Sequence, residues 1–261
     1  MTLIKHEMRQ GKVTFIIWTI SIGFFLVLCI FLFPEMKDQM NNINDVFASM
    51  GSFTDAFQMD QLNFGTLIGF YGIECGNILG LGGAFYAAFC AIIMLSKEEK
   101  ERTAEFLLTH PVSRIRIVTE KLMAVFIQII AMNIIIYILS VGSITIISEE
   151  ILWKEITLLH FAYFLLQIEV AMICFGISAF IRKGSIGIGL GIAASMYFLN
   201  IVANITSNVE FLKYITPFGY TEAADIIING CLDNKKVLIG MAVGFISVVT
   251  AYWNYNRKDI Y

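Results

Sequence analysis

The stretch that decides the fold is LMAVFIQIIAMNIIIYILSVGSITII, residues Leu122–Ile147. It contains no Asp, Glu, Lys or Arg, and roughly 20 consecutive apolar residues suffice for a helix to cross a bilayer. Hydrophobic residues make up 57% of the chain and charged residues 15%, and the mean hydropathy is +0.74. Five further segments are similarly apolar, with Glu74 and Glu169 as their only charged residues: Val13–Phe33, Leu67–Leu95, Ile156–Ile181, Ile186–Ala203 and Val237–Trp253. The sequence therefore predicts an all-α polytopic membrane protein, with six transmembrane helices in a single domain over residues 1–261.

The distribution of Lys and Arg indicates the orientation of these helices, because cytoplasmic loops of membrane proteins are enriched in them. With the amino terminus in the cytoplasm, the inner segments hold 13 of the 18 basic residues. The inner residues are Lys5, Arg9, Lys12, Lys97, Lys100, Arg102, Arg114, Arg116, Lys121, Arg182, Lys183, Arg257 and Lys258. The outer ones are Lys37, Lys154, Lys213, Lys235 and Lys236. Both termini are therefore predicted to be cytoplasmic.

A charged segment, KEEKERTAEFLLTHPVSRIRIVTEK (Lys97–Lys121), separates the second span from the third. Its apolar residues Leu107 and Leu108 are predicted to lie on one face of a short amphipathic helix, which ends at Pro111. Ser113 is placed to cap the helix that follows. One interpretation is a solvated connector that only enforces topology. The other is a docking helix, because the apolar face needs a partner.

Several motifs of the chain resemble those of ABC type-2 permeases. In the segment above, the matching residues are Thr103, Glu105, Leu107, Leu108, Pro111, Val112, Ser113, Arg114 and Lys121, whereas Arg102 replaces the usual glycine. Further matches are MTLIKHEMRQGK at the amino terminus, TPFGY (Thr216–Tyr220), ADIIING (Ala224–Gly230) and NRKDI (Asn256–Ile260). The resemblance covers the whole chain, and it implies that residues 1–12 form a cytoplasmic elbow helix.

The resemblance also implies partners. In that family two six-helix subunits form the pore and two cytoplasmic ATPase subunits bind beneath, so the second subunit here would be another copy of this chain or a paralogous permease. The segment between spans two and three would be the coupling helix, and the residues expected to contact the ATPase are Glu101, Arg102, Thr103, Glu105, Phe106, Leu107, Leu108, Pro111 and Arg114. The chain would also contact membrane lipid, and no nucleic acid, in a bacterial plasma membrane.

The chain lacks the sequence features of an enzyme. It has no GxxxxGK[ST] phosphate loop, and the longest inner segment, Ser96 to Lys121, is too short for a nucleotide-binding domain. Catalytic residues are therefore not expected, and neither is a cofactor in this chain, so ATP and Mg²⁺ would be bound by the partner subunit. A metal site is not expected either, because the five Cys and three His residues form no cluster.

Polar and glycine residues within the spans are the other candidates. Helix rise places Glu169 and Asn133 each about 18 Å from the cytoplasmic end of its span, and intramembrane acids are functional candidates. The two residues either form an interhelical hydrogen bond or line the translocation path. A ridge of small residues in span two and a glycine pair in span five predict close helix packing. These glycines are Gly72, Gly76, Gly80, Gly187 and Gly191.

Two segments outside the spans show helical patterns. The spacing of Met36, Met40, Ile43, Phe47 and Met50 predicts an amphipathic helix ending at Gly51. The loop from Asn204 to Lys236 is predicted to contain a short helix over Thr221–Asn229, stopped by Gly230.

Three functions fit these observations. The first is the permease subunit of an ATP-driven exporter. The apolar spans suit a lipid, a hydrophobic peptide or a lipophilic antibiotic as substrate. The second is a gradient-driven secondary transporter or channel with Glu169 as its ion or proton site. The third is a membrane scaffold or sensor without transport. Purification together with a soluble ATPase separates the first function from the others.

Overall fold

The computed structural model describes residues 2–49, 51, 54, 56, 61–101, 112–181 and 185–257. Within these ranges the regular secondary structure is helical. The elements are α1 (Thr2–Gln10), α2 (Lys12–Ser49), α4 (Leu67–Cys75), η1 (Gly76–Leu81), α5 (Gly82–Ile92), α6 (Lys97–Glu101), α8 (Arg114–Ile146), α9 (Trp153–Ser178), α10 (Ile186–Ile205), η2 (Ser207–Tyr214), η3 (Pro217–Tyr220), α11 (Ala223–Asn229) and α12 (Asn234–Arg257).

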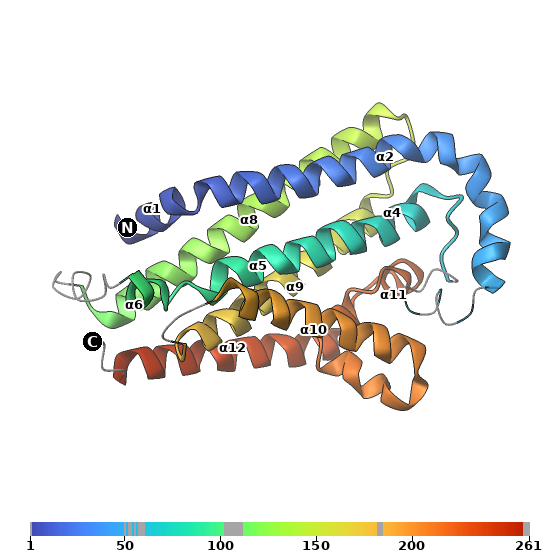
Figure 1. Ribbon diagram of the computed structural model, residues 1–261. Coiled ribbons are helices and arrows are strands. Elements are labelled where there is room, and N and C mark those ends of the chain that lie inside the picture. The colour runs from blue at the N-terminus through green and yellow to red at the C-terminus, as the bar shows by residue number, and fades with distance from the viewer. Residues whose placement is uncertain are drawn as a thin grey trace.

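Six helices of the described chain are long and apolar enough to cross a membrane, which confirms the predicted fold class. They are Lys12–Lys37, Leu67–Ile92, Arg114–Ile146, Trp153–Ser178, Ile186–Ile205 and Asn234–Arg257. Figure 1 shows these helices running side by side along one axis, with the N and C labels at the same end of the bundle. We call this the terminal end, and the opposite end the distal end.

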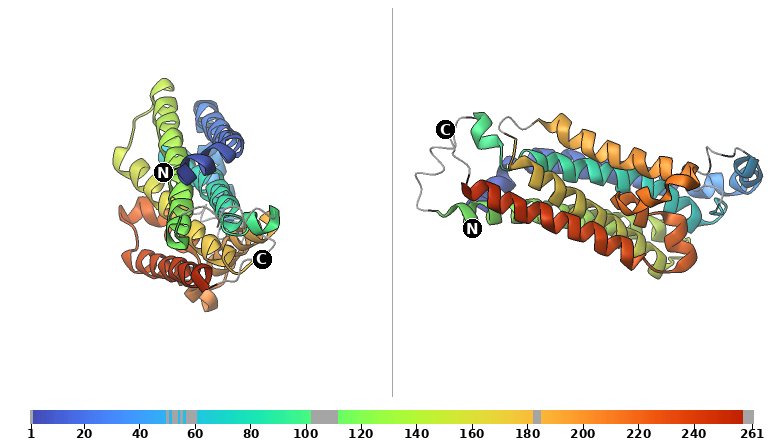
Figure 2. Two further views of the ribbon diagram at one scale, coloured as in Figure 1. Left: turned by 90° about the vertical axis from the view of Figure 1, so that its left-hand side faces the viewer. Right: turned by 90° about the horizontal axis from the view of Figure 1, so that it is seen from below.

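Helix α9 lies at the centre of the bundle. It packs against α5, α8 and α12, as the end-on and lower views in Figure 2 illustrate. In the most apolar 18-residue stretch of α9, 72% of the residues are buried, whereas the value is only 22% for the corresponding stretches of α10 and of α12. Because no water is present in a bilayer core, the exposed faces of α10 and α12 are suited to lipid or to another membrane helix.

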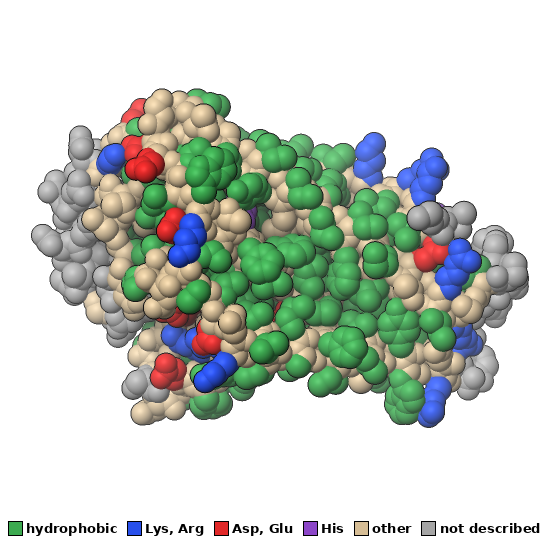
Figure 3. All heavy atoms as spheres, turned by 180° about the vertical axis from the view of Figure 1, so that it is seen from behind, with side chains coloured by type: hydrophobic (Ala, Val, Ile, Leu, Met, Phe, Trp, Pro, Cys, Tyr) green, Lys and Arg blue, Asp and Glu red, His purple; other side chains and the backbone are tan. Residues whose placement is uncertain are grey.

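The surface matches a membrane environment. In Figure 3 hydrophobic side chains cover the middle of the molecule, and charged side chains gather toward both ends. Lys and Arg predominate at the terminal end in that view. This is the charge bias from which the cytoplasmic location of both termini is predicted.

Helix α2 is longer than predicted. The sequence predicts that the first span ends before Pro34 and that a separate amphipathic helix follows, but one helix runs from Lys12 to Ser49 with Pro34 inside it. Proline has no N–H, so the hydrogen bond to the carbonyl of Ile30 is missing and the helix is weakened there. Figure 1 shows α2 turning across the distal end of the bundle after its straight part. Gly51 follows with φ of +55°.

The second span is not a uniform α-helix. Its middle, Gly76–Leu81, is a π-helix between α4 and α5, and π-helical turns occur mostly as local insertions in α-helices, often at functional sites. The glycine spacing predicts close packing here but does not reveal the change of helix type.

Local capping follows the sequence. The Ser113 hydroxyl accepts a hydrogen bond from the N–H of Arg116 and caps α8, as predicted. Helix α11 begins at Ala223, two residues later than predicted, and ends at Asn229; Gly230 follows it with a φ of +61°, which glycine readily adopts. The TPFGY motif begins with Thr216, which caps η3.

Candidate functional site

A buried ion cluster joins three elements at the terminal end. Lys121 of α8 is fully buried. Its Nζ donates a hydrogen bond to the Met94 carbonyl at 2.6 Å and pairs with Glu98 of α6 and with Glu7 of α1. Lys97 of α6 also pairs with Glu7. We call Glu7, Lys97, Glu98 and Lys121 the Lys–Glu cluster.

The cluster compensates the burial of its charges. Isolated charges are very unfavourable inside a protein, so each needs a partner. Burial alone would raise the pKa of Glu7, but the positive charges of Lys121 and Lys97 outweigh burial and lower the pKa below its ordinary value of 4.5. Glu7 is therefore ionised at neutral pH, and α1 and α6 are both held to the start of α8.

A second contact holds the other end of α1. The backbone N–H groups of Leu3 and Ile4 donate to Oε2 of Glu120, at 3.1 and 3.3 Å. Arg116 donates to the other oxygen of Glu120 at 2.8 Å. The first N–H groups of a helix have no intrahelical acceptor, and an anion there is stabilised. A helix thus lies where the sequence predicts the elbow helix, while its cytoplasmic location stays a prediction.

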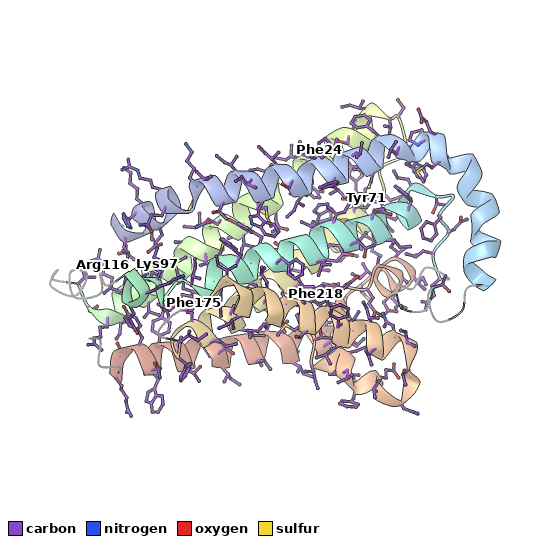
Figure 4. The ribbon with its side chains drawn as sticks, in the orientation of Figure 1. Phe24, Tyr71, Lys97, Arg116, Phe175 and Phe218 are labelled. Atoms are coloured by element: carbon purple, nitrogen blue, oxygen red, sulfur yellow. The ribbon has the colours of Figure 1, made fainter. Side chains whose placement is uncertain are left out.

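Most of the predicted ATPase-docking residues lie outside the described part of the chain: Arg102, Thr103, Glu105, Phe106, Leu107, Leu108 and Pro111. Glu101 is the last residue of α6. Arg114 donates to the carbonyls of Tyr255 and Asn256, at 3.1 and 3.4 Å. A cation at the end of α12 complements its carbonyl groups, so Arg114 ties the start of α8 to α12. Figure 4 shows Lys97 and Arg116 at this terminal end.

A pocket of about 310 Å³ lies beside the Lys–Glu cluster. Apolar and sulfur-containing side chains from the end of the second span form one wall: Phe89, Cys90, Ile93 and Met94. The polar part of its lining includes Glu7, Lys97 and Gln128. The volume is at the lower end of the range for small-molecule sites, and the lining suits an amphipathic molecule.

Glu169 and Asn133 belong to two separate networks. Glu169 is buried and accepts a hydrogen bond from the Tyr220 hydroxyl at 2.9 Å. Asn133 donates to Gln167 at 2.6 Å and to the carbonyl of Ile129. Of the two alternatives, the Glu169–Asn133 hydrogen bond is therefore not the one formed, because each side chain has another partner; the lining of a translocation path stays a prediction. Gln167 and Glu169 are two residues apart, so they point about 200° apart around α9, and it is Gln167 that faces α8.

The surroundings of Glu169 leave little room. A Cβ atom on Gly240 of α12 would lie 2.2 Å from Oε2 of Glu169. Gly240 is therefore where α12 passes over the carboxylate. Sequence analysis missed this glycine, although Gly240 and Gly244 have the same four-residue spacing as Gly187 and Gly191.

The glycines of the second span lie against other elements. A Cβ on Gly72 would approach Ile227 and Ala223, and one on Gly76 or Gly80 would approach Tyr163. Gln167 follows one turn after Tyr163 and donates to the carbonyl of Leu79 within the π-helix, at 3.3 Å. The irregular middle of the second span is thus fitted to one face of α9.

Within the described part of this chain, the glycine pair predicted for the fifth span does not form a close packing contact, and packing against another molecule stays a prediction. A Cβ on Gly187 would meet only Ser185, at 3.6 Å, and one on Gly191 would meet nothing within 4 Å among the described residues. Gly189 packs instead, since a Cβ there would lie 2.8 Å from Ile92 and 2.9 Å from the Ala88 carbonyl. Residues two apart lie on opposite sides of a helix, and the buried side of α10 is that of Gly189.

Comparison with known proteins gives one family. The family model described as "ABC-2 family transporter protein" matches residues 1–260. The chain belongs to the ABC-2 transporter family. No curated protein matches it. As an ABC-2 transporter it is a multi-pass membrane transport protein rather than a catalytic subunit.

The comparison gives a context for residues that sequence analysis did not select. In this ABC-2 transporter, Glu7, Glu98 and Glu120 position α1 and α6 against α8. Glu7 lies in the matched amino-terminal segment and Glu120 lies next to Lys121, more than 100 residues later. Only the fold brings both of them to the contact between α1 and α8. Of the motif residues, Lys121 is at the centre of the cluster. Among the described residues no group of three His, Cys, Asp or Glu side chains could hold a metal ion.

Proposed function

We propose that this ABC-2 family protein is the membrane-spanning permease subunit of an ATP-driven exporter. Its substrate would be a hydrophobic or amphipathic molecule such as a lipid, a peptide or an antibiotic. Two ATPase subunits, which bind ATP and Mg²⁺, would dock on the segment between α6 and α8, and a second permease copy or a paralogue would complete the pore. The protein would lie in a bacterial plasma membrane with both termini in the cytoplasm.

The observation that carries the proposal is the Lys–Glu cluster. The segment proposed to dock begins at the end of α6 and ends at the first residue of α8. Lys97 and Glu98 of α6 pair with Glu7 of α1 and Lys121 of α8. If an ATPase displaced α6, the ion pairs of Lys97 and Glu98 would have to move with it, because breaking a buried ion pair costs a large free energy. The pocket of about 310 Å³ beside the cluster gives an amphipathic substrate a place near the same residues.

The test is retention and stimulation of the ATPase subunit by the permease in reconstituted membrane. The variant carries Leu107→Asp and Leu108→Asp. Burying a leucine contributes roughly 1.5–3 kcal/mol, so the loss of both should weaken docking by about two to four powers of ten. A matched control carries His6→Asp and Arg9→Asp, which add acids on the exposed side of α1. Wild-type retention of the ATPase by the double leucine variant would reject the docking assignment.

A gradient-driven transporter is the second candidate, because Glu169 is buried within a span and accepts from Tyr220. In that case Glu169→Gln abolishes transport driven by a pH or ion gradient in vesicles without any ATPase. Transport that requires ATP and persists in Glu169→Gln rejects this second candidate.

A further inference from the structure

The pocket of about 310 Å³ beside the Lys–Glu cluster also reaches into the bundle. Its lining comes from the joint between α1 and α2, from the end of α5, from the start of α6, and from Gln128 of α8. Gln128 follows Lys121 by seven residues, which is about 10 Å further along α8. Figure 4 labels Lys97, one of the lining residues at the terminal end. The pocket therefore extends from the charged cluster to an amide within the third span.

The amide nitrogen of Gln128 has no partner, although the residue is only 3% exposed. Its Oε1 accepts a hydrogen bond from the Tyr86 hydroxyl at 2.9 Å, and Cys90 Sγ lies 3.9 Å from the same atom. Because the fully buried Tyr86 hydroxyl needs an acceptor, the amide oxygen and not the nitrogen faces it. Nε2 forms no hydrogen bond within the described part of the chain. Two N–H donors of a buried side chain are therefore unused.

Nε2 of Gln128 can be reached from the pocket. Fully inaccessible polar atoms without a partner occur elsewhere in the described chain, as at the Tyr163 hydroxyl, but Nε2 is not one of them. Gly11, at the joint of α1 and α2, lies beside the amide, since a Cβ at this position would be 3.1 Å from Oε1 and 3.2 Å from Nε2. Both residues line the pocket. The missing side chain at Gly11 therefore leaves space for a ligand atom next to the amide.

The charges around the pocket cancel. Among the described lining residues the charged ones are Glu7 and Lys97, which pair with each other. Lys97 also donates to Oε1 of Gln10 at 2.8 Å, and the Lys–Glu cluster as a whole has two carboxylates and two ammonium groups. A charged ligand head would thus enter without a counter-charge, which is unfavourable at a buried position. The unused amide N–H groups favour an uncharged oxygen acceptor such as a carbonyl.

We propose that this pocket binds an uncharged carbonyl group carried on an alkyl chain, with Nε2 of Gln128 donating to the carbonyl oxygen. The alkyl chain lies along the apolar wall that Phe89, Ile93 and Met94 form. The carbonyl can come from an ester or amide of a transported substrate or from the ester of a membrane lipid. Where the occupant is transported, the proposal rests on the proposed permease function. Binding itself requires no ATPase, so a failure of ATPase docking leaves it unaffected.

The test uses Cys90, which lines the pocket, as a reporter. The full-length protein is placed in nanodiscs of diether phosphatidylcholine, which has no carbonyl group, and alkylation by N-ethylmaleimide is followed by peptide mass spectrometry. Methyl decanoate should slow the alkylation of Cys90 in a concentration-dependent way. Cys231 is exposed and does not line the pocket, so its rate should stay constant. Undecane has a similar chain and no acceptor, and the same protection should require a concentration about threefold to tenfold higher.

A second reporter covers the case in which Cys90 does not react in the ligand-free protein. Thr14→Cys, in a chain that also carries Cys90→Ala, places a thiol at a half-buried position of the lining on α2. Protection of either reporter by methyl decanoate at a lower concentration than by undecane supports the carbonyl site. Equal protection by the two compounds, or no protection of either reporter, would overturn the proposal.

Variants of Tyr86 and Gln128 separate binding from structure. The double variant Tyr86→Phe, Gln128→Leu removes both partners of one buried hydrogen bond, so its Tm should stay close to that of the wild type. It lacks the amide donor, so the methyl decanoate concentration needed for protection should rise about threefold to tenfold. Tyr86→Phe alone keeps the donor. It should lower the Tm, because Oε1 loses a partner, and retain the protection.

Gly11→Ala tests the space beside the amide. The added methyl group would lie where the carbonyl is proposed to bind, so protection by methyl decanoate should weaken at least as much as in the double variant. The matched control is Gly142→Ala, which is outside the pocket and where no described residue lies within 4 Å of the new Cβ. Wild-type protection in both Gly11→Ala and the double variant would overturn the proposal.

Lipid composition distinguishes the sources of the carbonyl group. If an ester lipid fills the pocket, Cys90 reacts more slowly in nanodiscs of diester phosphatidylcholine than in those of the diether lipid, and the double variant removes this difference. If only a free amphiphile enters, Cys90 reacts equally fast in both kinds of nanodisc, and methyl decanoate protects it in both. Either result keeps the carbonyl site, and neither depends on ATPase docking.

Discussion

Replacement of Lys121 tests the Lys–Glu cluster most directly. Lys121→Met removes the charge and keeps an unbranched side chain of similar size. Lys121 is fully buried and pairs with Glu98 and Glu7, so the variant leaves two carboxylates without this partner. Removing one member of a buried ion pair costs about 3–5 kcal/mol. For a chain of this size each kcal/mol corresponds to roughly 2–4 °C in Tm, so we expect a loss of roughly 6–20 °C.

The control for Lys121→Met is Lys37→Met, which removes the same residue type from an ion pair. Lys37 and Glu149 are 2.7 Å apart, and their side chains are 42% and 25% exposed. Exposed pairs contribute about 0–1 kcal/mol, so the Tm should fall by less than about 4 °C. Both variants are measured as full-length protein in nanodiscs by thermal unfolding. Adding Glu98→Gln to Lys121→Met should recover part of the loss. A loss for Lys121→Met no larger than for Lys37→Met would refute the reasoning.

Four further predictions concern the other contacts. Gly240→Ala should destabilise by about 1–3 kcal/mol because its Cβ would collide with Glu169, whereas Gly142→Ala, where no described residue lies within 4 Å of the new Cβ, should be neutral or stabilising; equal Tm values would contradict the contact. Gly189→Ala should lower the Tm and Gly191→Ala should not; a loss at Gly191 would indicate packing against another copy. Because its pKa is lowered, Glu7 stabilises the fold fully above pH 4.5, so the Tm difference between the wild type and Glu7→Gln should shrink as pH falls below that value. Cysteines replacing Asn42 and Asn208 should react with an external impermeant maleimide, and cysteines replacing Thr103 and Lys258 should not; labelling at Thr103 would reverse the orientation.

The helices were predictable because their signal is local. Each span is a continuous apolar run, and Ser113 and Gly230 act on their own helix ends. The errors arise where a local pattern competes with tertiary packing. Pro34 is a strong stop signal, yet α2 continues through it. Gln167 and Glu169 are two polar positions on opposite sides of α9, and the sequence does not indicate which of them faces α8.

The candidate site was less predictable because its residues are distant in sequence. The apolar face of Leu107 and Leu108 could be inferred from spacing, but the pairing of Lys121 with Glu7 depends on how α1 lies on α8. The same holds for Tyr163, because only the packing of the second span beside α9 shows that its hydroxyl has no hydrogen-bond partner among the described residues. Sequence indicates which residues are unusual in a span. The fold determines what they contact.

The arrangement suggests how the two ends of the molecule can communicate. Helix α5 leads through residues 93–96 into α6, which belongs to the Lys–Glu cluster. At its other end α5 continues the π-helix, where Gln167 binds the Leu79 carbonyl and Tyr163 lies against Gly76 and Gly80. Irregular turns are where long helices bend. A displacement of α6 would therefore be transmitted along α5 and taken up at the π-helix, against the buried α9. Gly76 and Tyr163 also line a pocket of about 80 Å³ in the distal half of the bundle, so the point of bending is part of its wall. A change in the cluster at the terminal end thus has a direct structural route to the shape of the pocket at the distal end.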